Sequence, residues 1–271
     1  MGEIRIGTSG FSYDDWRGFF YPKDIQKGDM LGYYAERFSA VEVNSSFYAI
    51  LSASAFARMA EKTPKSFEFV VKAYKDLTHA PDVDLSAFEP FVSVLAPLVE
   101  VGKLGCVLAQ YPWSFKREKK NFDRLRQLRE QFGELPVVVE FRNAGWVGEE
   151  TFDFLREHSL GFCCVDEPRL RGLMPPVAVA TCPVGYVRFH GRNVEKWWQH
   201  EEAWQRYDYL YSSSELSEWI PKVRELASAT EKTYLFFNNH YQGKSAQNAQ
   251  MFAGMLRLME VQGDEADLPP S

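Results

Sequence analysis

An arginine and a histidine alternate with bulky apolar residues in the segment GYVRFHGRN at residues 185–193. Bulky apolar residues favour β-strands, and side chains two positions apart on a strand point to the same side. Arg188 and His190 therefore share one side of a predicted strand. A guanidinium binds phosphate or carboxylate through two parallel hydrogen bonds, and an imidazole exchanges a proton near neutral pH. The pair predicts a site for an anionic group.

Polar residues also end most of the other strand-like segments. In sequence order they are Glu42, Asn44, Lys72, Gln110, Glu140, Arg142, Asp166 and Asn238. Glu42 with Asn44, and Glu140 with Arg142, have the same two-residue spacing, so each pair points to one side. Because carboxylates and cations are balanced in number, a buried ion-pair network that fills the fold is an alternative to a site. This alternative applies above all to Glu42 and Lys72, which lie deeper in their strands.

Long loops rich in aromatic residues follow several of these segments. The loop at residues 191–214 begins at a glycine and carries a second arginine, Arg192. Trp16, Tyr48 and Trp146 lie in the stretches after the first, second and fifth strand-like segments. Such side chains stack on bases or sugar rings. The alternative is that they form a hydrophobic plug that anchors the loops.

The elements that position these residues follow one repeated pattern. Eight short apolar segments begin near residues 4, 40, 67, 105, 137, 161, 186 and 234. Most intervening stretches have apolar residues three or four apart, as helices do. Alternating strands and helices predict right-handed βαβ units and a single (β/α)8 TIM-type barrel with parallel strands. We expect the barrel to span residues 1–262, with its active face at the C-terminal strand ends, and residues 263–271 to be a flexible tail.

Composition limits the classes of function. The formal net charge of −6 argues against a broad nucleic-acid-binding face but allows a local basic cavity. The four cysteines lack the spacing of a zinc site or a disulfide framework. The first ten residues, MGEIRIGTSG, lack the apolar run after a basic region that is typical of a secretory leader, and the printed sequence has no apolar run long enough to span a bilayer. We therefore expect a soluble cytoplasmic protein without a membrane partner, and the pattern does not predict its oligomeric state.

Motifs along nearly the whole chain resemble the YecE-like family, a domain of unknown function that bears the number seventy-two. The motifs are IGTSGFSYDDWRGFFYP, VEVNSSFY, FEFVVKAYKDLTH, LGCVLAQYPWSF, VVVEFRNAGW, YVRFHGRN with YDYLYSSSEL, and FFNNHYQGKSAQNA, in family order from residue 4 to about residue 258. The resemblance implies a TIM-type barrel and no particular activity. This chain departs from the family by having Asn143 after Arg142, where the family often has histidine, and Phe11 where it usually has tryptophan. A mechanism that needs a histidine at position 143 is therefore disfavoured.

The residues favour a hydrolase or lyase that acts on an anionic, phosphate-bearing substrate, including nucleic acid. The predicted catalytic residues are His190, as acid or base, and Glu140 and Asp166, which would orient it or activate water. The predicted substrate-binding residues are Arg188, Arg142, Lys72, Asn44, Glu42, Asn238, Arg192, Trp16, Tyr48 and Trp146. No metal or cofactor is assigned, although one divalent cation on Glu140, Asp166 and Asn238 would suit their oxygen ligands.

Two other functions are also compatible with the sequence. One is a carbohydrate-active enzyme with Glu42 and Glu140 as its carboxylate pair. This function is disfavoured because Lys72 and Arg142 lie at the same end of the predicted barrel and would lower the pKa of both carboxylates, whereas a general acid needs a raised pKa. The other is a non-catalytic module that binds a nucleotide or single-stranded nucleic acid through arginines and aromatic residues.

Overall fold

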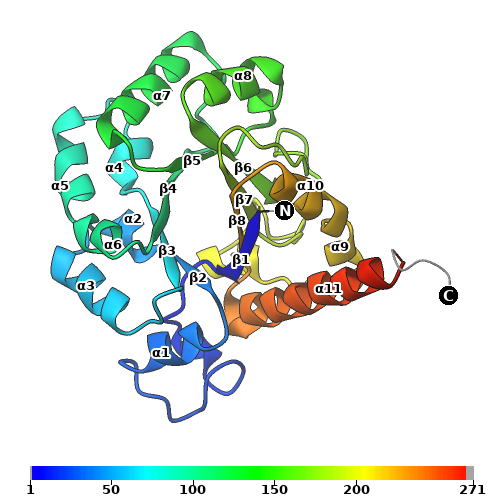
Figure 1. Cartoon of the computed structure of the whole chain (residues 1–271). Helices are drawn as coiled ribbons and strands as arrows, with labels where there is room; N and C mark the ends of the chain where they lie inside the picture. Colours follow the sequence, from blue (N-terminus) through cyan, green and yellow to red (C-terminus); the bar gives the residue numbers. More distant parts are fainter. Residues whose placement is uncertain (1, 267–271) are drawn as a thin grey trace.

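The computed structural model describes residues 2–266 and confirms the predicted barrel. Eight parallel strands form its wall, and helices surround them on the outside (Figure 1). The strands are β1 (Glu3–Thr8), β2 (Ala40–Val43), β3 (Glu68–Lys72), β4 (Leu104–Gln110), β5 (Val137–Glu140), β6 (Leu160–Asp166), β7 (Val184–Phe189) and β8 (Lys232–Phe237).

Most of the connections between strands are helical. The α-helices are α1 (Met30–Ala35), α2 (Ser45–Tyr48), α3 (Ala53–Glu61), α4 (Lys75–Thr78), α5 (Phe88–Ser93), α6 (Ala96–Glu100), α7 (Lys119–Phe132), α8 (Glu149–Glu157), α9 (Ser213–Ser217), α10 (Ile220–Ser228) and α11 (Lys244–Ala266). Short 3-10 helices lie at η1 (Asp14–Trp16), η2 (Leu85–Ala87), η3 (Ala144–Trp146), η4 (Ala203–Tyr207) and η5 (Tyr241–Gly243). Residues 167–183, all within the described chain, form no helix, as their irregular sequence predicts.

Residues 263–266 belong to α11, so the part of the predicted tail that the structure describes is helical. The rest of the predicted tail, residues 267–271, lies outside the described residues. Across residues 2–266, none of the helices combines the length and the apolar character needed to cross a membrane.

The barrel closes between β1 and β2 through a short seam. Sequence neighbours pair along the rest of the wall, in the order β1-β8-β7-β6-β5-β4-β3-β2. At the seam, Ser9 and Glu42 form an isolated parallel bridge. The Tyr34 hydroxyl lies between the strands, 2.8 Å from the Thr8 backbone nitrogen and 3.2 Å from the Ala40 carbonyl oxygen. A side chain of α1 therefore supplies polar partners where the backbone ladder is interrupted.

The two faces of β7 show how the wall separates apolar packing from polar contacts. Phe189 packs outward against Trp219 before α10 and Phe252 of α11. Arg188 points the other way and reaches Glu42 of β2 and Glu140 of β5 across the barrel. Arg188, Glu42 and Glu140 thus lie inside the barrel, as predicted, whereas Asp166, which was predicted to lie there too, faces outward toward Trp219.

Candidate functional site

Arg188 is the centre of a buried polar network at the base of the barrel mouth. Its Nη1 donates to Glu140 Oε2 and its Nη2 to Glu42 Oε1, each at 2.6 Å. The Tyr186 hydroxyl donates to the second oxygen of Glu42, also at 2.6 Å. Arg188 is only 1% exposed, and both terminal nitrogens of its guanidinium donate to carboxylates. For Arg188 and Glu42 the structure therefore supports the buried-network alternative over direct contact with a ligand.

His190 extends this network from the next inward-facing position. Its Nε2 lies 3.1 Å from Glu140 Oε1, and its Nδ1 lies 3.1 Å from Asn238 Nδ2. Since the amide nitrogen of Asn238 is a donor, Nδ1 accepts and Nε2 carries the proton that is donated to Glu140. Burial, together with the charge of Arg142, lowers the pKa of His190 to about 3. The residue is neutral near pH 7 and orients Glu140.

The carboxylate of Glu140 remains ionised despite its complete burial. Burial alone would raise its pKa, but the guanidiniums of Arg142 and Arg188 hold the pKa well below its usual range. Arg142 Nε lies 2.6 Å from Glu140 Oε1. Glu140 is therefore poised to fix Arg142 at the mouth and is unsuited to donate a proton.

A cavity of about 340 Å³, which we call the mouth cavity, opens directly above this network, among the loops that follow the strands. It is lined by Phe47, Tyr48, Lys72, His79, Gln110, Pro112, Trp113, Arg142, Glu167, Leu173, Trp197, Trp198, Arg206 and Tyr207. Lys72, Arg142 and Arg206 bring three basic side chains to the lining, against one acidic side chain, Glu167. A negatively charged chain thus carries a locally basic cavity at the face where TIM barrels place their active sites.

Lys72, the last residue of β3, reaches this cavity without an acidic partner. Its Nζ donates to Gln110 Oε1 at 2.9 Å and lies 4.0 Å from the centre of the Phe47 ring. Within the described part of the chain it forms no ion pair. Burial and the nearby charge of Arg188 lower the pKa of Lys72 to about 7. A large fraction of this side chain is therefore an uncharged amine at neutral pH.

Glu167, like Arg206, is a cavity residue that the sequence-based prediction missed. Its Oε1 accepts a hydrogen bond from the Met174 backbone nitrogen at 2.8 Å. Its Oε2 is buried, makes no hydrogen bond within the described residues, and lies 3.6 Å from Arg142 Nη1. Burial raises the pKa of Glu167 to about 7, so the carboxyl group can give or take a proton near neutral pH. The alternation of β6 was the available signal, because Asp166 and Glu167 must face opposite sides.

Asp166 faces away from the cavity and holds the loop at 191–214 in place. Its two oxygens each accept a hydrogen bond from Arg192 at 2.8 Å. Tyr211 and Trp219 donate to the same carboxylate at 2.8 and 2.7 Å. Burial alone would raise the pKa of Asp166. These hydrogen bonds, of which those from Arg192 contribute most, hold the pKa below its usual range. The structure thus pairs two predicted site residues, Asp166 and Arg192, with each other on the outer side of the strand.

The three residues considered as metal ligands, Glu140, Asp166 and Asn238, do not lie together. Glu140 and Asn238 belong to the network around His190, whereas Asp166 binds Arg192 behind the wall. In residues 2–266 there is no group of three or more His, Cys, Asp or Glu side chains arranged to hold a metal ion. The residues present do not fit the cation site considered from the sequence.

The predicted aromatic residues have two different locations. Trp16 and Trp146 are fully buried and donate from their indoles to the backbone carbonyls of His240 and Phe115. They anchor loops, as the plug alternative predicts. Tyr48 is 74% exposed at the edge of the cavity. Asn44 does not line the cavity, and its buried Oδ1 has no hydrogen-bond partner among the described residues.

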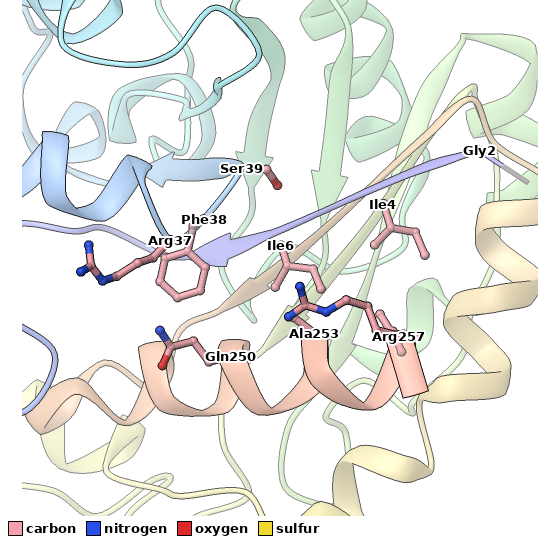
Figure 2. A pocket seen from close by; sticks show the side chains of 10 residues that line it. Gly2, Ile4, Ile6, Arg37, Phe38, Ser39, Gln250, Ala253 and Arg257 are labelled. Carbon is pink, nitrogen blue, oxygen red and sulfur yellow. The ribbon is translucent and has the colours of Figure 1, made fainter. Parts of the chain in front are cut away.

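A second, larger groove lies on the outside of the barrel. It encloses about 690 Å³ between β1 and α11, and Figure 2 shows Ile4 and Ile6 facing Ala253 and Arg257 across it. Apart from Arg37 and Arg257, its lining residues carry no titratable side chain. The mouth cavity brings acidic, basic and amide groups together, so the mouth is the candidate catalytic site.

Comparison with known proteins places the chain in a family. A family model described as a protein of unknown function, DUF72, matches residues 5–270. The chain belongs to the DUF72 family. It is 33% identical to the UPF0759 protein YunF of Bacillus subtilis (strain 168), over 96% of this chain and 95% of that protein.

Solved structures of the DUF72 family share the barrel. The DUF72 family protein TM1631 of Thermotoga maritima is 41% identical over 94% of this chain and 99% of its own, with a TM-score of 0.86. The DUF72 family protein EF0366 of Enterococcus faecalis is 27% identical over 94% of this chain and 95% of its own, with a TM-score of 0.83. The family and the fold expected from the sequence are both confirmed.

Proposed function

We propose that this DUF72 protein is an enzyme, of the lyase or hydrolase class, that acts on a small phosphate-bearing substrate in the mouth cavity. The observation that carries the proposal is the meeting of two guanidiniums and the amine of Lys72 with one protonatable carboxyl group, Glu167, in a cavity at the C-terminal face of the barrel. Catalytic groups of TIM barrels occupy this face, and perturbed pKa values concentrate at active sites.

Arg142 and Arg206 supply the anion-binding side of the cavity. Arg142 is fixed by Glu140 at 2.6 Å. Arg206 donates through Nε to the Trp197 carbonyl at 2.9 Å and forms no ion pair within residues 2–266, which leaves its terminal nitrogens for a ligand. Guanidiniums bind phosphate through paired hydrogen bonds. A volume of about 340 Å³ suits a sugar phosphate or a mononucleotide.

Lys72 and Glu167 supply the acid–base chemistry. Each has a pKa of about 7, one lowered by burial and Arg188 and the other raised by burial. Proton transfer is most efficient when the pKa of the catalytic group is close to the working pH. His190, in contrast, acts through Glu140 and does not line the cavity.

A second candidate function is nucleotide binding without catalysis. Three exposed aromatic side chains, Tyr48, Trp113 and Trp198, stand at the edge of the cavity, and Trp113 and Trp198 are arranged edge to face. Such side chains stack on bases. The carbohydrate alternative has weaker support, since Arg188 bridges Glu42 and Glu140 and the pKa of Glu140 is low.

Thermal melting with matched ligands tests the proposal. sn-Glycerol 3-phosphate at about 100 times its Kd should stabilise the fold by about 2.7 kcal/mol, or roughly 5–10 °C, whereas glycerol should have no effect. Arg206→Met should abolish the shift, and Arg58→Met, at an exposed position on α3, should keep it. No shift with the phosphate, or an equal shift in both variants, would overturn the proposal. Stabilisation by adenosine monophosphate alone would favour nucleotide binding.

A further inference from the structure

We propose that Lys72 is the nucleophile of the mouth cavity and forms a Schiff base with the aldehyde or ketone group of a phosphate-bearing substrate. This inference rests on the proposed function, because Arg142 and Arg206 would hold the phosphate group while the carbonyl carbon meets Nζ. It specifies the substrate class as a small carbonyl phosphate.

The contacts of Lys72 are those of a reactive amine and not of a structural cation. Its partners are an amide oxygen of Gln110 and the face of Phe47, both uncharged. Lys232, in comparison, pairs with Glu68 at 2.5 Å. Lys103 is more deeply buried, but its Nζ is occupied by three oxygens of Ala60 and Thr63. Lys72 thus combines a half-buried position, access to a cavity and the lack of an acidic partner among the described residues.

The charges around Lys72 favour its neutral form. The groups that face it are Arg188, Glu140, Glu42, Arg142 and His79. Arg188 already bridges the carboxylates of Glu42 and Glu140, which therefore compensate the charge of Arg188 and do not bind Nζ of Lys72. With burial as the largest cause and Arg188 next, the pKa of Lys72 is about 7. Desolvation beside another cation is the way in which proteins activate lysine as a nucleophile.

The reaction needs one proton donor, and Glu167 is placed to supply it. The Lys72 lone pair forms a C–N bond to the carbonyl carbon, and the C=O electron pair moves to the oxygen. Transfer of a proton from nitrogen to this oxygen gives a neutral carbinolamine. The carboxyl group of Glu167 then protonates the hydroxyl group, which leaves as water when the C–O bond breaks and an iminium ion remains. Glu167 lines the same cavity, and its buried Oε2 has no hydrogen-bond partner in residues 2–266.

The iminium ion explains why a lyase fits this cavity. It withdraws electrons from the adjacent carbon–carbon or carbon–hydrogen bond, and the carboxylate that Glu167 has become can accept the proton released there. Gln110 stays within hydrogen-bond distance of the nitrogen and fixes its direction. No metal or redox partner is needed for the step.

Reductive trapping tests the inference in the wild-type protein. Glyceraldehyde 3-phosphate with sodium cyanoborohydride at pH 7 should attach one reduced adduct, which peptide mass spectrometry should locate on Lys72. Glyceraldehyde without the phosphate should label Lys72 at least tenfold more slowly. Inorganic phosphate in excess should slow the labelling by glyceraldehyde 3-phosphate.

Two lysine variants provide the matched comparison. Lys72→Met should lose the adduct, whereas Lys75→Met, at an exposed position on α4, should be labelled as the wild type is. Labelling of Lys72 no faster than that of exposed lysines would overturn the inference. If sn-glycerol 3-phosphate stabilises the fold but no adduct forms, the Schiff base is wrong and the proposed anion site stands. If the adduct forms at equal rates with and without the phosphate group, the anion site is wrong.

Discussion

Replacing Arg188 by methionine should strongly destabilise the fold. The substitution removes the cation that lies 2.6 Å from both Glu42 and Glu140 and leaves two carboxylates buried without it. Removing one partner of a buried ion pair costs roughly 3–5 kcal/mol. In a protein of this size each kcal/mol corresponds to roughly 2–4 °C in Tm, so we expect a decrease of roughly 6–20 °C at pH 7.

The loss should depend on pH with a definite sign. The folded-state pKa of Glu140 is depressed, so its ionisation stabilises the wild type above the unfolded-state value of about 4.3. That contribution is lost as the pH falls through the folded-state value. Arg188→Met raises the folded-state pKa and removes part of the contribution. The difference in Tm between variant and wild type should therefore be largest above about pH 5 and decrease at pH 4.

Thermal melting followed by circular dichroism at pH 7 and pH 4 measures both effects. Adding Glu42→Gln to Arg188→Met removes the carboxylate left without a cation, since Glu140 keeps Arg142 at 2.6 Å, and should recover at least half of the lost Tm. A single variant that melts within about 3 °C of the wild type at pH 7 would refute the reasoning. So would a deficit that is unchanged at pH 4.

Three further predictions concern the seam, the outer loop and the buried histidine. Tyr34→Phe removes the hydroxyl that joins β1 to β2 and should cost about 1–3 kcal/mol in the free energy of unfolding, measured by urea denaturation. Asp166→Asn removes one of the two carboxylate oxygens that accept hydrogen bonds from Arg192, so it should cost about 3 kcal/mol and expose the loop at 191–214 to proteolysis. Phosphate binding should weaken as well, because Arg206 lies in the same loop. His190 should keep the NMR shifts of a neutral imidazole from pH 5 to pH 8, and a titration midpoint above pH 5 would contradict this. Because the pKa of His190 is lower in the folded state than in the unfolded state, the free energy of unfolding should decrease as the pH falls below about 6.5.

Much of the fold followed from the sequence because it depends on local patterns. Alternating apolar segments and helical stretches specify strands and helices, and eight repeats leave few arrangements other than a barrel. The two-residue spacing of Arg188 and His190 placed both inside, where they contact Glu140. Spacing along one strand is sufficient for this step because the side chains of a strand alternate.

The candidate site was less predictable because it depends on contacts between distant segments. Asp166 and Glu167 are adjacent, and only the pairing of β6 with its neighbours decides which of them faces the cavity. Arg206 comes from the 3-10 helix η4 in a long loop, whose path no periodicity reveals. That Arg188 binds two carboxylates and Lys72 binds none depends on lengths and directions of side chains across the barrel. Sequence identified Arg188, Glu140 and Lys72 but not their partners, and it missed Glu167 and Arg206.

An anomalous difference map from a crystal soaked in tungstate, an oxyanion that resembles phosphate, tests most directly whether the mouth is an anion site. We expect the strongest peak in the cavity, within hydrogen-bond distance of the guanidiniums of Arg142 and Arg206. A cavity without tungstate, with the strongest peak instead at Arg37 and Arg257 in the outer groove, would contradict the assignment.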